Sequence, residues 1–181
     1  MSSDRHRLLN DIIDGAQGNL PEEIKQRLII SLMHHTEPTD FGDGIMRQLK
    51  VTEMQMLRRG KDGHRHAHIV FELVIQRDMM SALGSIHEGC LAYLVDICSS
   101  ITIGLLDIVT DGTAERVSQA IDMIYHAAAK AGDTLEIVNV TTHRSSRSVS
   151  ARTEIWNVTN RRLVASGTHI KMRPGAPKTK L

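Results

Sequence analysis

The sequence has few aromatic residues, and it lacks both a strong net charge and a long uninterrupted apolar run. Aromatic residues make up 3% of the 181 residues, so the core must be built mainly from aliphatic side chains and Met, and stacking on exposed bases is poorly supplied. The net charge of +1 creates no general field toward nucleic acid or a membrane surface. We therefore expect neither a nucleic-acid partner nor insertion into a membrane.

Cysteine is also scarce, and both copies lie in one apolar stretch. Cys90 and Cys98 would stand about 12 Å apart along a helix, which is too far for a disulfide. We expect both to be reduced in an intracellular, cytoplasmic protein, and a mitochondrial location stays open. The N-terminus shows no secretory signal. The apolar window 91–106 contains Asp96, and we judge it too short and too polar to span a bilayer.

The pattern of apolar residues changes once along the chain. Helical spacing over 4–14 and 21–35 is followed by a turn-rich linker at 36–44 and then by period-two segments. The predicted strands are 46–58 and 65–77 around a turn at 59–63, and then, after a helix at 88–106, 115–127, 134–143, 147–158 and 162–173. This order predicts an α+β fold in which a sheet curls around one long central helix. We divide the chain into an N-terminal helical extension and linker (1–44), a main domain (45–173) and a tail (174–181).

Asp96 interrupts the apolar helix. One stripe of that helix is apolar and suits the core, whereas Asp96 lies on a second stripe of small or mildly polar residues. One interpretation makes Asp96 a solvated residue, or one satisfied by Ser99 and Ser100. The other makes it a functional carboxylate in an apolar environment that tunes its pKa. The pattern alone does not decide between them.

The helix begins with His87, Glu88 and Gly89, which form either an ordinary polar entry or part of a site. A helix N-terminus offers unpaired N–H groups that could bind a carbonyl oxygen as it becomes negative in acyl transfer. Glu88 and Asp96 are about 12 Å apart along one helix, whereas a reacting carbonyl needs both groups within about 3 Å. Two antiparallel copies would bring them together, so an active site here favours a dimer with shared sites.

The run Gly84-Ser85-Ile86-His87-Glu88-Gly89, with Asp96 nine residues after His87, resembles the hotdog-fold acyl-CoA thioesterases of the phenylacetate-degradation and eukaryotic type. Their signature is G-x-x-H-G-G with Asp or Glu nine residues after the His. The resemblance continues through segments 117–118, 123–125, 129–133 and 163–171, and covers about residues 46–173.

The resemblance implies a hotdog fold, with an antiparallel sheet around the helix and two subunits joined edge to edge as a homodimer or a dimer of dimers (a homotetramer). It implies hydrolysis of acyl-CoA to free acid and CoA, in lipid metabolism, without a metal or a cofactor other than the CoA of the substrate. The thioester carbonyl would rest on the N–H of Glu88, with Gly89 adjoining, and Asp96 of the partner would activate water or attack directly.

Three further roles follow from the same resemblance. Ser118 matches a serine that orients the water, His87 would shape the oxyanion loop, and Ser81 stands where relatives often have Asn or Gln. CoA carries phosphates, so a basic rim is expected. The candidates on the late strands are Arg144, Arg147, Lys171 and Arg173, with a solvated face as the alternative.

Two residues depart from the family pattern. Glu88 replaces the first Gly of H-G-G, which keeps the N–H but adds bulk and charge, and Ser81 replaces the amide. A protein that binds acyl-CoA without hydrolysing it, as a sensor or scaffold, is therefore the first alternative. An enoyl-thioester hydratase is the second, although its short motif is absent from the sequence. His64, His66 and His68 alternate along a predicted strand without further nearby ligands, so we expect no zinc there.

Overall fold

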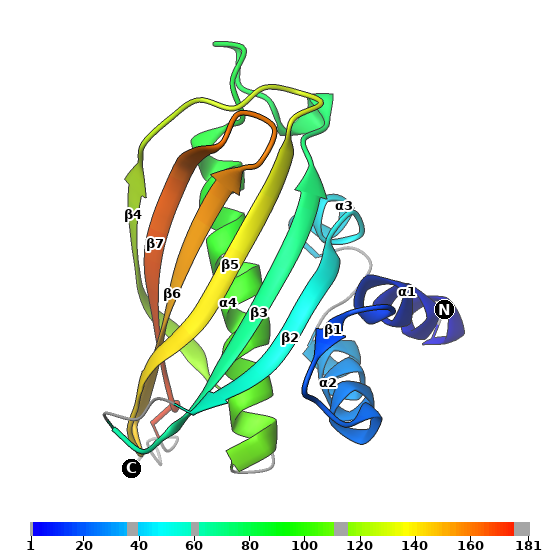
Figure 1. Ribbon diagram of the computed structural model, residues 1–181, viewed down its shortest axis with the longest axis vertical. Helices are drawn as coiled ribbons and strands as arrows, with labels where there is room; N and C mark the ends of the chain where they lie inside the picture. The colour runs from blue at the N-terminus through cyan, green and yellow to red at the C-terminus, as the bar shows by residue number, and fades with distance from the viewer. Residues whose placement is uncertain (1, 36–39, 59–61, 111–115, 176–181) are drawn as a thin grey trace, which may run out of the picture.

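The computed structural model describes residues 2–35, 40–58, 62–110 and 116–175. Its longest helix, α4 (Glu88–Thr110), lies in the concave side of a curved sheet, as Figure 1 shows. The strands are β1 (Gln17–Gly18), β2 (Lys50–Arg58), β3 (Arg65–Val74), β4 (Val117–Tyr125), β5 (Thr134–Arg144), β6 (Ser148–Asn157) and β7 (Arg162–Met172), and the other helices are α1 (Ser2–Ile13), α2 (Glu22–His35), α3 (Asp43–Met46) and a 3₁₀ turn, η1 (Arg77–Met79).

The seven strands form one sheet in the order β1-β2-β3-β5-β6-β7-β4. β1 is parallel to β2, and every other neighbouring pair is antiparallel. β4 therefore forms one edge and has only β7 beside it. The prediction of a sheet curled around one long helix is confirmed, and the two-residue strand β1 was not predicted.

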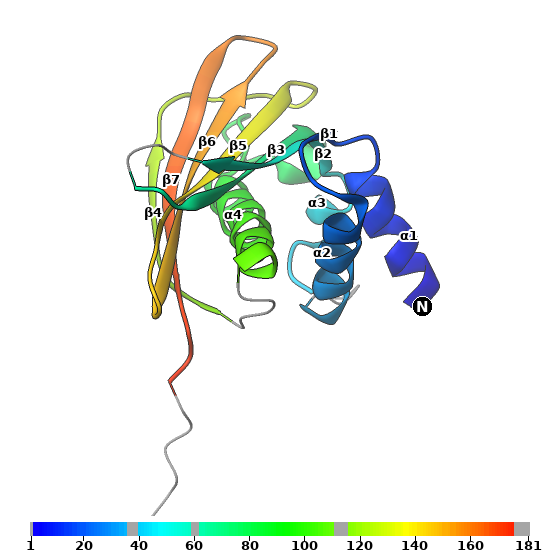
Figure 2. The same cartoon turned by 60° about the horizontal axis from the view of Figure 1, so that its bottom comes forward.

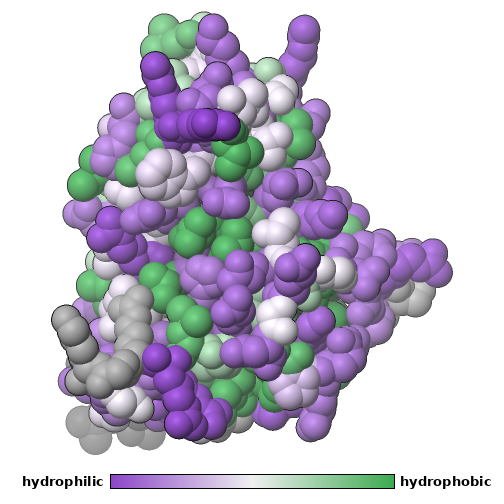
Figure 3. Space-filling model, viewed as in Figure 1, coloured by the Kyte–Doolittle hydropathy of each residue, from purple (hydrophilic) through white to green (hydrophobic). Residues whose placement is uncertain are grey.

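The core lies between α4 and the inner face of the sheet. Leu94, Val95 and Cys98 recur on the buried stripe of α4, while the inward positions of β3, such as Ile69 and Phe71, alternate along that strand. Both cysteines are buried and neither forms a disulfide. Figure 3 shows the outer face of the sheet, where polar side chains predominate and apolar ones are interspersed. The apolar residues of the helical pattern and those of the strand pattern therefore pack into one core.

The N-terminal helices pack on the side of α4 that the sheet leaves open. Figures 1 and 2 show α1 and α2 beside β1 and β2, with α2 facing α4. Leu9, Ile12 and Ile29 are buried in the same apolar cluster as α4, and Leu28 joins them. The extension is thus built into the core of the protein.

Several predicted boundaries were wrong. The linker at 36–44 overlaps α3, whose Asp43 accepts a hydrogen bond from Arg5 Nη1 at 2.5 Å, and β2 begins at Lys50 because residues 43–46 are helical. The central helix continues past residue 106 to Thr110. Parts of the predicted linker (36–39), turn (59–61) and tail (176–181) lie outside the described residues.

The central helix also corrects the argument about membranes. With 23 residues, α4 is long and apolar enough to cross a bilayer, so the sequence argument from length was wrong. Most of its apolar window is buried inside the protein. Burial by the sheet and α2 identifies α4 as a core helix.

Candidate active site

Asp96 lies on the side of α4 that faces β7 and the start of β4. Its side chain is 47% exposed in the single chain, and its Oδ1 lies 3.7 Å from Nε2 of His169, beyond hydrogen-bond distance. Among the described residues, no donor hydrogen-bonds to the Asp96 carboxylate. The sequence left open whether Asp96 is solvated or lies in an apolar environment, and in the structure about half of its side chain is open to a reactant.

His169 of β7 connects two serines beside this carboxylate. Its ring is fully buried, with Nδ1 2.7 Å from Ser99 Oγ and Nε2 3.0 Å from Ser118 Oγ. Ser99 donates its single hydroxyl proton to the Val95 carbonyl oxygen at 2.6 Å, so it must accept from His169 Nδ1–H. Nε2 of a neutral ring is then the acceptor, and Ser118 donates to it.

The neutral state of this ring follows from its surroundings. Burial, which is the largest cause, and the nearby Lys171 ammonium lower the pKa of His169, while Asp96 raises it, and the net result is a fall from 6.5 to about 4. Near neutral pH the ring is therefore uncharged. The Ser118 hydroxyl therefore donates its hydrogen bond to His169, and the lone pairs of its oxygen face the space beside Asp96.

Lys171 continues the inward row of β7 next to Asp96. Its Nζ donates to Ser100 Oγ at 2.8 Å, and burial lowers the pKa of the amine while Asp96 raises it. Neither the Ser99 nor the Ser100 hydroxyl forms a hydrogen bond with the Asp96 carboxylate. Ser99 bonds to Val95 and His169 instead, and Ser100 to Lys171. The interpretation that these serines satisfy Asp96 therefore finds no hydrogen bond in its favour.

Asp96, Ser118 and Lys171 line one cavity of about 310 Å³ that runs along α4. Its opposite wall comes from α2, through Leu28, Ser31 and Leu32 on helical spacing. The volume lies at the lower end of the range for small-molecule sites. The predicted carboxylate and serine are thus brought together, and the N-terminal extension completes their cavity.

The second group of predicted residues lies at the N-terminus of α4, eight residues before Asp96. Nδ1 of His87 accepts a hydrogen bond from Gly89 N–H at 2.9 Å, which is the contact of an N-cap residue. His87 N–H in turn donates to the Met79 carbonyl, and Ser81 N–H to the Ser85 carbonyl. These contacts hold the loop before α4 in one conformation.

The N–H of Glu88 has no acceptor among the described residues, while that of Gly89 is occupied by His87. Glu88 itself is exposed, and its carbonyl accepts from Tyr125 Oη at 3.4 Å. One unpaired donor therefore remains at the positive end of α4. Asp96 of the same chain is about 12 Å further along the helix, so the two groups do not meet within one chain.

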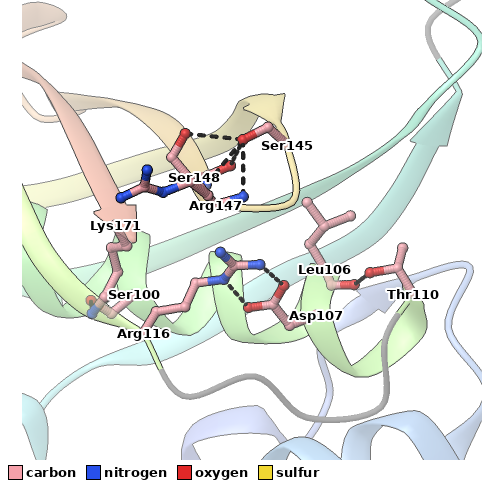
Figure 4. A network of polar contacts seen from close by, with 9 residues as sticks. All are labelled: Ser100, Leu106, Asp107, Thr110, Arg116, Ser145, Arg147, Ser148 and Lys171. Atoms are coloured by element: carbon pink, nitrogen blue, oxygen red, sulfur yellow. Dashed lines mark hydrogen bonds and ion pairs between the residues drawn. The ribbon is translucent and has the colours of Figure 1, made fainter. Parts of the chain in front are cut away.

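The predicted basic residues lie near the turn between β5 and β6 and the end of β7. Arg147 lies in the turn between β5 and β6, where its carbonyl accepts from Arg173 N–H at 2.9 Å, and Arg144 ends β5. Of the four, only Lys171 is among the residues that line the cavity. Figure 4 shows Lys171 and Ser100 on one side and the Arg147 turn above them.

The alternating histidines make ordinary protein contacts. Both ring nitrogens of His66 have partners, the Thr141 carbonyl at 2.7 Å and Asp62 Oδ2 at 2.8 Å, and His68 lies 3.3 Å from Glu53. No group of three or more metal-ligating side chains occurs within residues 2–35, 40–58, 62–110 and 116–175.

Sequence reasoning missed three residues of the site. They are His169 and an ion pair that also lines the cavity, Asp107 with Arg116. His169 and Lys171 are polar residues two apart on a strand that otherwise buries Ala165 and Gly167 on the same face. That inward alternation was the available signal for His169. Asp107 lies just beyond the predicted end of the helix, and nothing in the sequence pairs it with Arg116.

The depressed pKa of His169 predicts that the protein is less stable in acid. The unfolded chain binds a proton at His169 below about pH 6.5, and the folded chain only below about pH 4. Between these values the unfolded state binds more protons, so the free energy of unfolding falls as the pH falls, by roughly 3 kcal/mol over the whole interval. Urea unfolding of wild type and His169→Gln from pH 7 to pH 4 measures this, and an equal pH slope in both proteins would contradict it.

Comparison with known proteins supports the fold. Residues 83–164 match the family model described as thioesterase superfamily. Zebrafish thioesterase superfamily member 2 shares 22% identity with a TM-score of 0.63, covering 86% of this chain and all of that chain. The Escherichia coli PaaI protein of the phenylacetic acid degradation operon shares 18% identity with a TM-score of 0.64, covering 87% and 98%.

A hypothetical thioesterase from Streptococcus pneumoniae, solved with coenzyme A, shares 23% identity with a TM-score of 0.54 and covers 70% of this chain and 89% of its own. The search of curated proteins found no match. At these identities the solved structures establish the fold, and they confirm the predicted hotdog architecture of a long central helix against a sheet with N-terminal helices.

Proposed function

We propose, for a chain whose residues 83–164 match the thioesterase superfamily model, that the protein hydrolyses acyl-CoA thioesters to a free acid and CoA. The observation that carries this proposal is the convergence of Asp96 and Ser118 on one cavity beside a neutral His169. The solved relative that holds coenzyme A supports CoA as the thiol part of the substrate.

Asp96 acts as the general base for water. A water molecule between Asp96 and Ser118 can donate one proton to the carboxylate and the other to the Ser118 oxygen, whose own proton is held by His169. A lone pair of the water oxygen is then free to attack the thioester carbon. The tetrahedral intermediate collapses by breaking the C–S bond, and the proton that Asp96 accepted neutralises the CoA thiolate.

The free N–H of Glu88 stabilises the oxyanion of that intermediate. Because Glu88 and Asp96 of one chain are about 12 Å apart, the donor comes from a second subunit. The edge strand β4 is where we place that subunit. It exposes Val117, Ile121, Ile124 and Tyr125, and an exposed apolar edge strand is a ready surface for pairing with another copy.

We place the substrate nucleotide at the basic residues around the turn between β5 and β6. Arg147 and Arg173 are exposed there and Arg144 is half-buried, so their guanidinium groups can reach phosphate oxygens. The carboxylate of Glu88 lies at the mouth of the site, where it limits how closely the pantetheine arm approaches the helix. An intracellular location, expected from the reduced cysteines, remains a prediction.

Free-thiol release from a panel of acyl-CoA esters tests the proposed function. Purified wild-type protein is expected to release CoA from at least one chain length with saturation kinetics. Binding of the esters in the same panel without thiol release would instead support the acyl-CoA-binding alternative, with Glu88 as the suspected cause. Consumption of an enoyl ester without thiol release would support a hydratase.

A further inference from the structure

The cavity beside Asp96 continues toward the C-terminal half of α4. Its floor follows one face of that helix through Tyr93, Ile97, Ser100, Gly104 and Asp107, at steps of three and four residues. Small residues in the middle, Ser100 and Gly104, leave room there, and Leu28 and Leu32 of α2 cover it. From Asp96 to Asp107 the helix rises about 16 Å, so the cavity has the shape of a channel.

A buried ion pair closes the far end of this channel. Arg116 donates from Nε to Asp107 Oδ2 at 2.6 Å and from Nη2 to Asp107 Oδ1 at 2.8 Å. The two side chains are only 2% and 4% exposed. Both also line the cavity. The pair is therefore a fixed polar wall in a largely apolar channel.

One nitrogen of that pair is not satisfied. Nη1 of Arg116 is buried and has no hydrogen-bond partner among the residues that the structure describes. Figure 4 shows this nitrogen turned away from Asp107, while the other two face the carboxylate. A buried guanidinium N–H without an acceptor is costly, so the position favours a ligand that supplies an oxygen.

We propose that the channel holds the acyl chain and that Arg116 Nη1 recognises a neutral oxygen, a hydroxyl or keto group, near the end of that chain remote from the thioester. This rests on the proposed function, because the thioester must lie at Asp96. Leu28, Leu32 and Ile97 give this part of the channel an apolar wall, which suits an acyl chain and disfavours the charged phosphates of CoA.

The ion pair also determines whether a neutral or a charged group of the ligand can bind beside it. Asp107 already neutralises Arg116, so a terminal carboxylate would bring an uncompensated negative charge beside Asp107 into a buried space. A neutral oxygen satisfies the N–H without that charge. The second cation along the channel, Lys171, is engaged by Ser100 nearer to Asp96.

Matched substrates test the inference on the wild-type protein. Medium-chain acyl-CoA esters of equal length, ending in a methyl, a hydroxyl or a carboxylate group, are compared by kcat/KM for thiol release. We expect the hydroxyl-ended ester to be favoured about 10- to 100-fold over the methyl-ended one, and the carboxylate-ended ester to be the poorest. Equal kcat/KM values for the hydroxyl- and methyl-ended esters would overturn the inference and leave the proposed function standing.

A double variant then assigns the preference to the ion pair. Asp107→Leu with Arg116→Met replaces the buried pair by apolar side chains, a change that folds tolerate better than loss of one partner. Its hydroxyl-to-methyl ratio is expected to fall to about 1, whereas Arg162→Met, a change of an exposed Arg on β7, keeps the wild-type ratio. An unchanged ratio in the double variant would overturn the role of Arg116. Thiol release from none of the esters would contradict the proposed function and this inference together, and the wild-type comparison stands even if the double variant does not fold.

Discussion

Asp96→Asn is expected to lower kcat for thioester hydrolysis by at least about 100-fold while leaving the protein folded. The amide has the shape of the carboxylate but cannot take a proton from water. The Asp96 side chain is 47% exposed, and no described residue hydrogen-bonds to its carboxylate, so we expect the fold to tolerate the loss of its charge. The measurement is initial-rate thiol release with the best ester of the panel.

The matched control is Asp11→Asn, which makes the same change on an exposed residue of α1. It is expected to keep the wild-type kcat. Thermal unfolding and size-exclusion chromatography of both variants establish that fold and assembly are intact. Equal turnover by Asp96→Asn and the wild type would remove Asp96 from the mechanism, and Ser118 would lose its proposed partner with it.

Much of the fold could be predicted because each element carries its own period. α4 shows apolar residues at three- and four-residue steps, and the strands alternate, so helix and strands were identified within a few residues of their ends. The short strand β1 and helix α3 have no such period. Residues of these two elements take their conformation from tertiary contacts, such as the ion pair between Arg5 and Asp43.

The site was predictable only where it is local in sequence. Glu88 and Asp96 share one helix, and their spacing alone showed that one chain cannot bring them to the same carbonyl. His169 meets Ser118 through the register of β4 on β7, and this register is a property of the sheet. The pairing of Asp107 with Arg116 and the cover that α2 gives the cavity likewise depend on packing between distant segments.

The burial of Asp96 also depends on packing between segments that are distant in the sequence. The sequence placed a carboxylate among apolar neighbours and left open whether it is solvated or enclosed. In the structure, the apolar neighbours Val95 and Cys98 turn toward the sheet, while Asp96 opens on the cavity. Neighbours in sequence define a helix face only to within one turn, and which face stays open depends on what packs against it.

Glu88→Pro is expected to lower kcat by about 100- to 1000-fold, because it deletes the N–H at the start of α4 that has no acceptor among the described residues. Proline is well tolerated at the first position of a helix, and α4 begins at Glu88, so the helix can form without this N–H. Glu88→Gly is the matched control. It removes the same side chain but keeps the N–H, and is expected to stay within about tenfold of the wild type. Comparable losses in both variants would show that the side chain, and not the backbone donor, acts in the reaction.

Mixing the two inactive proteins tests whether the sites are shared between subunits. A heterodimer of Asp96→Asn and Glu88→Pro chains has one site with both defects, and one that combines an intact Asp96 with an intact Glu88 N–H. After unfolding and refolding of an equal mixture, half of the dimers are mixed and each has one working site, so about one quarter of the wild-type activity returns. If Asp96 and the oxyanion donor acted within one chain, no combination would rebuild a site and the mixture would stay as inactive as its components.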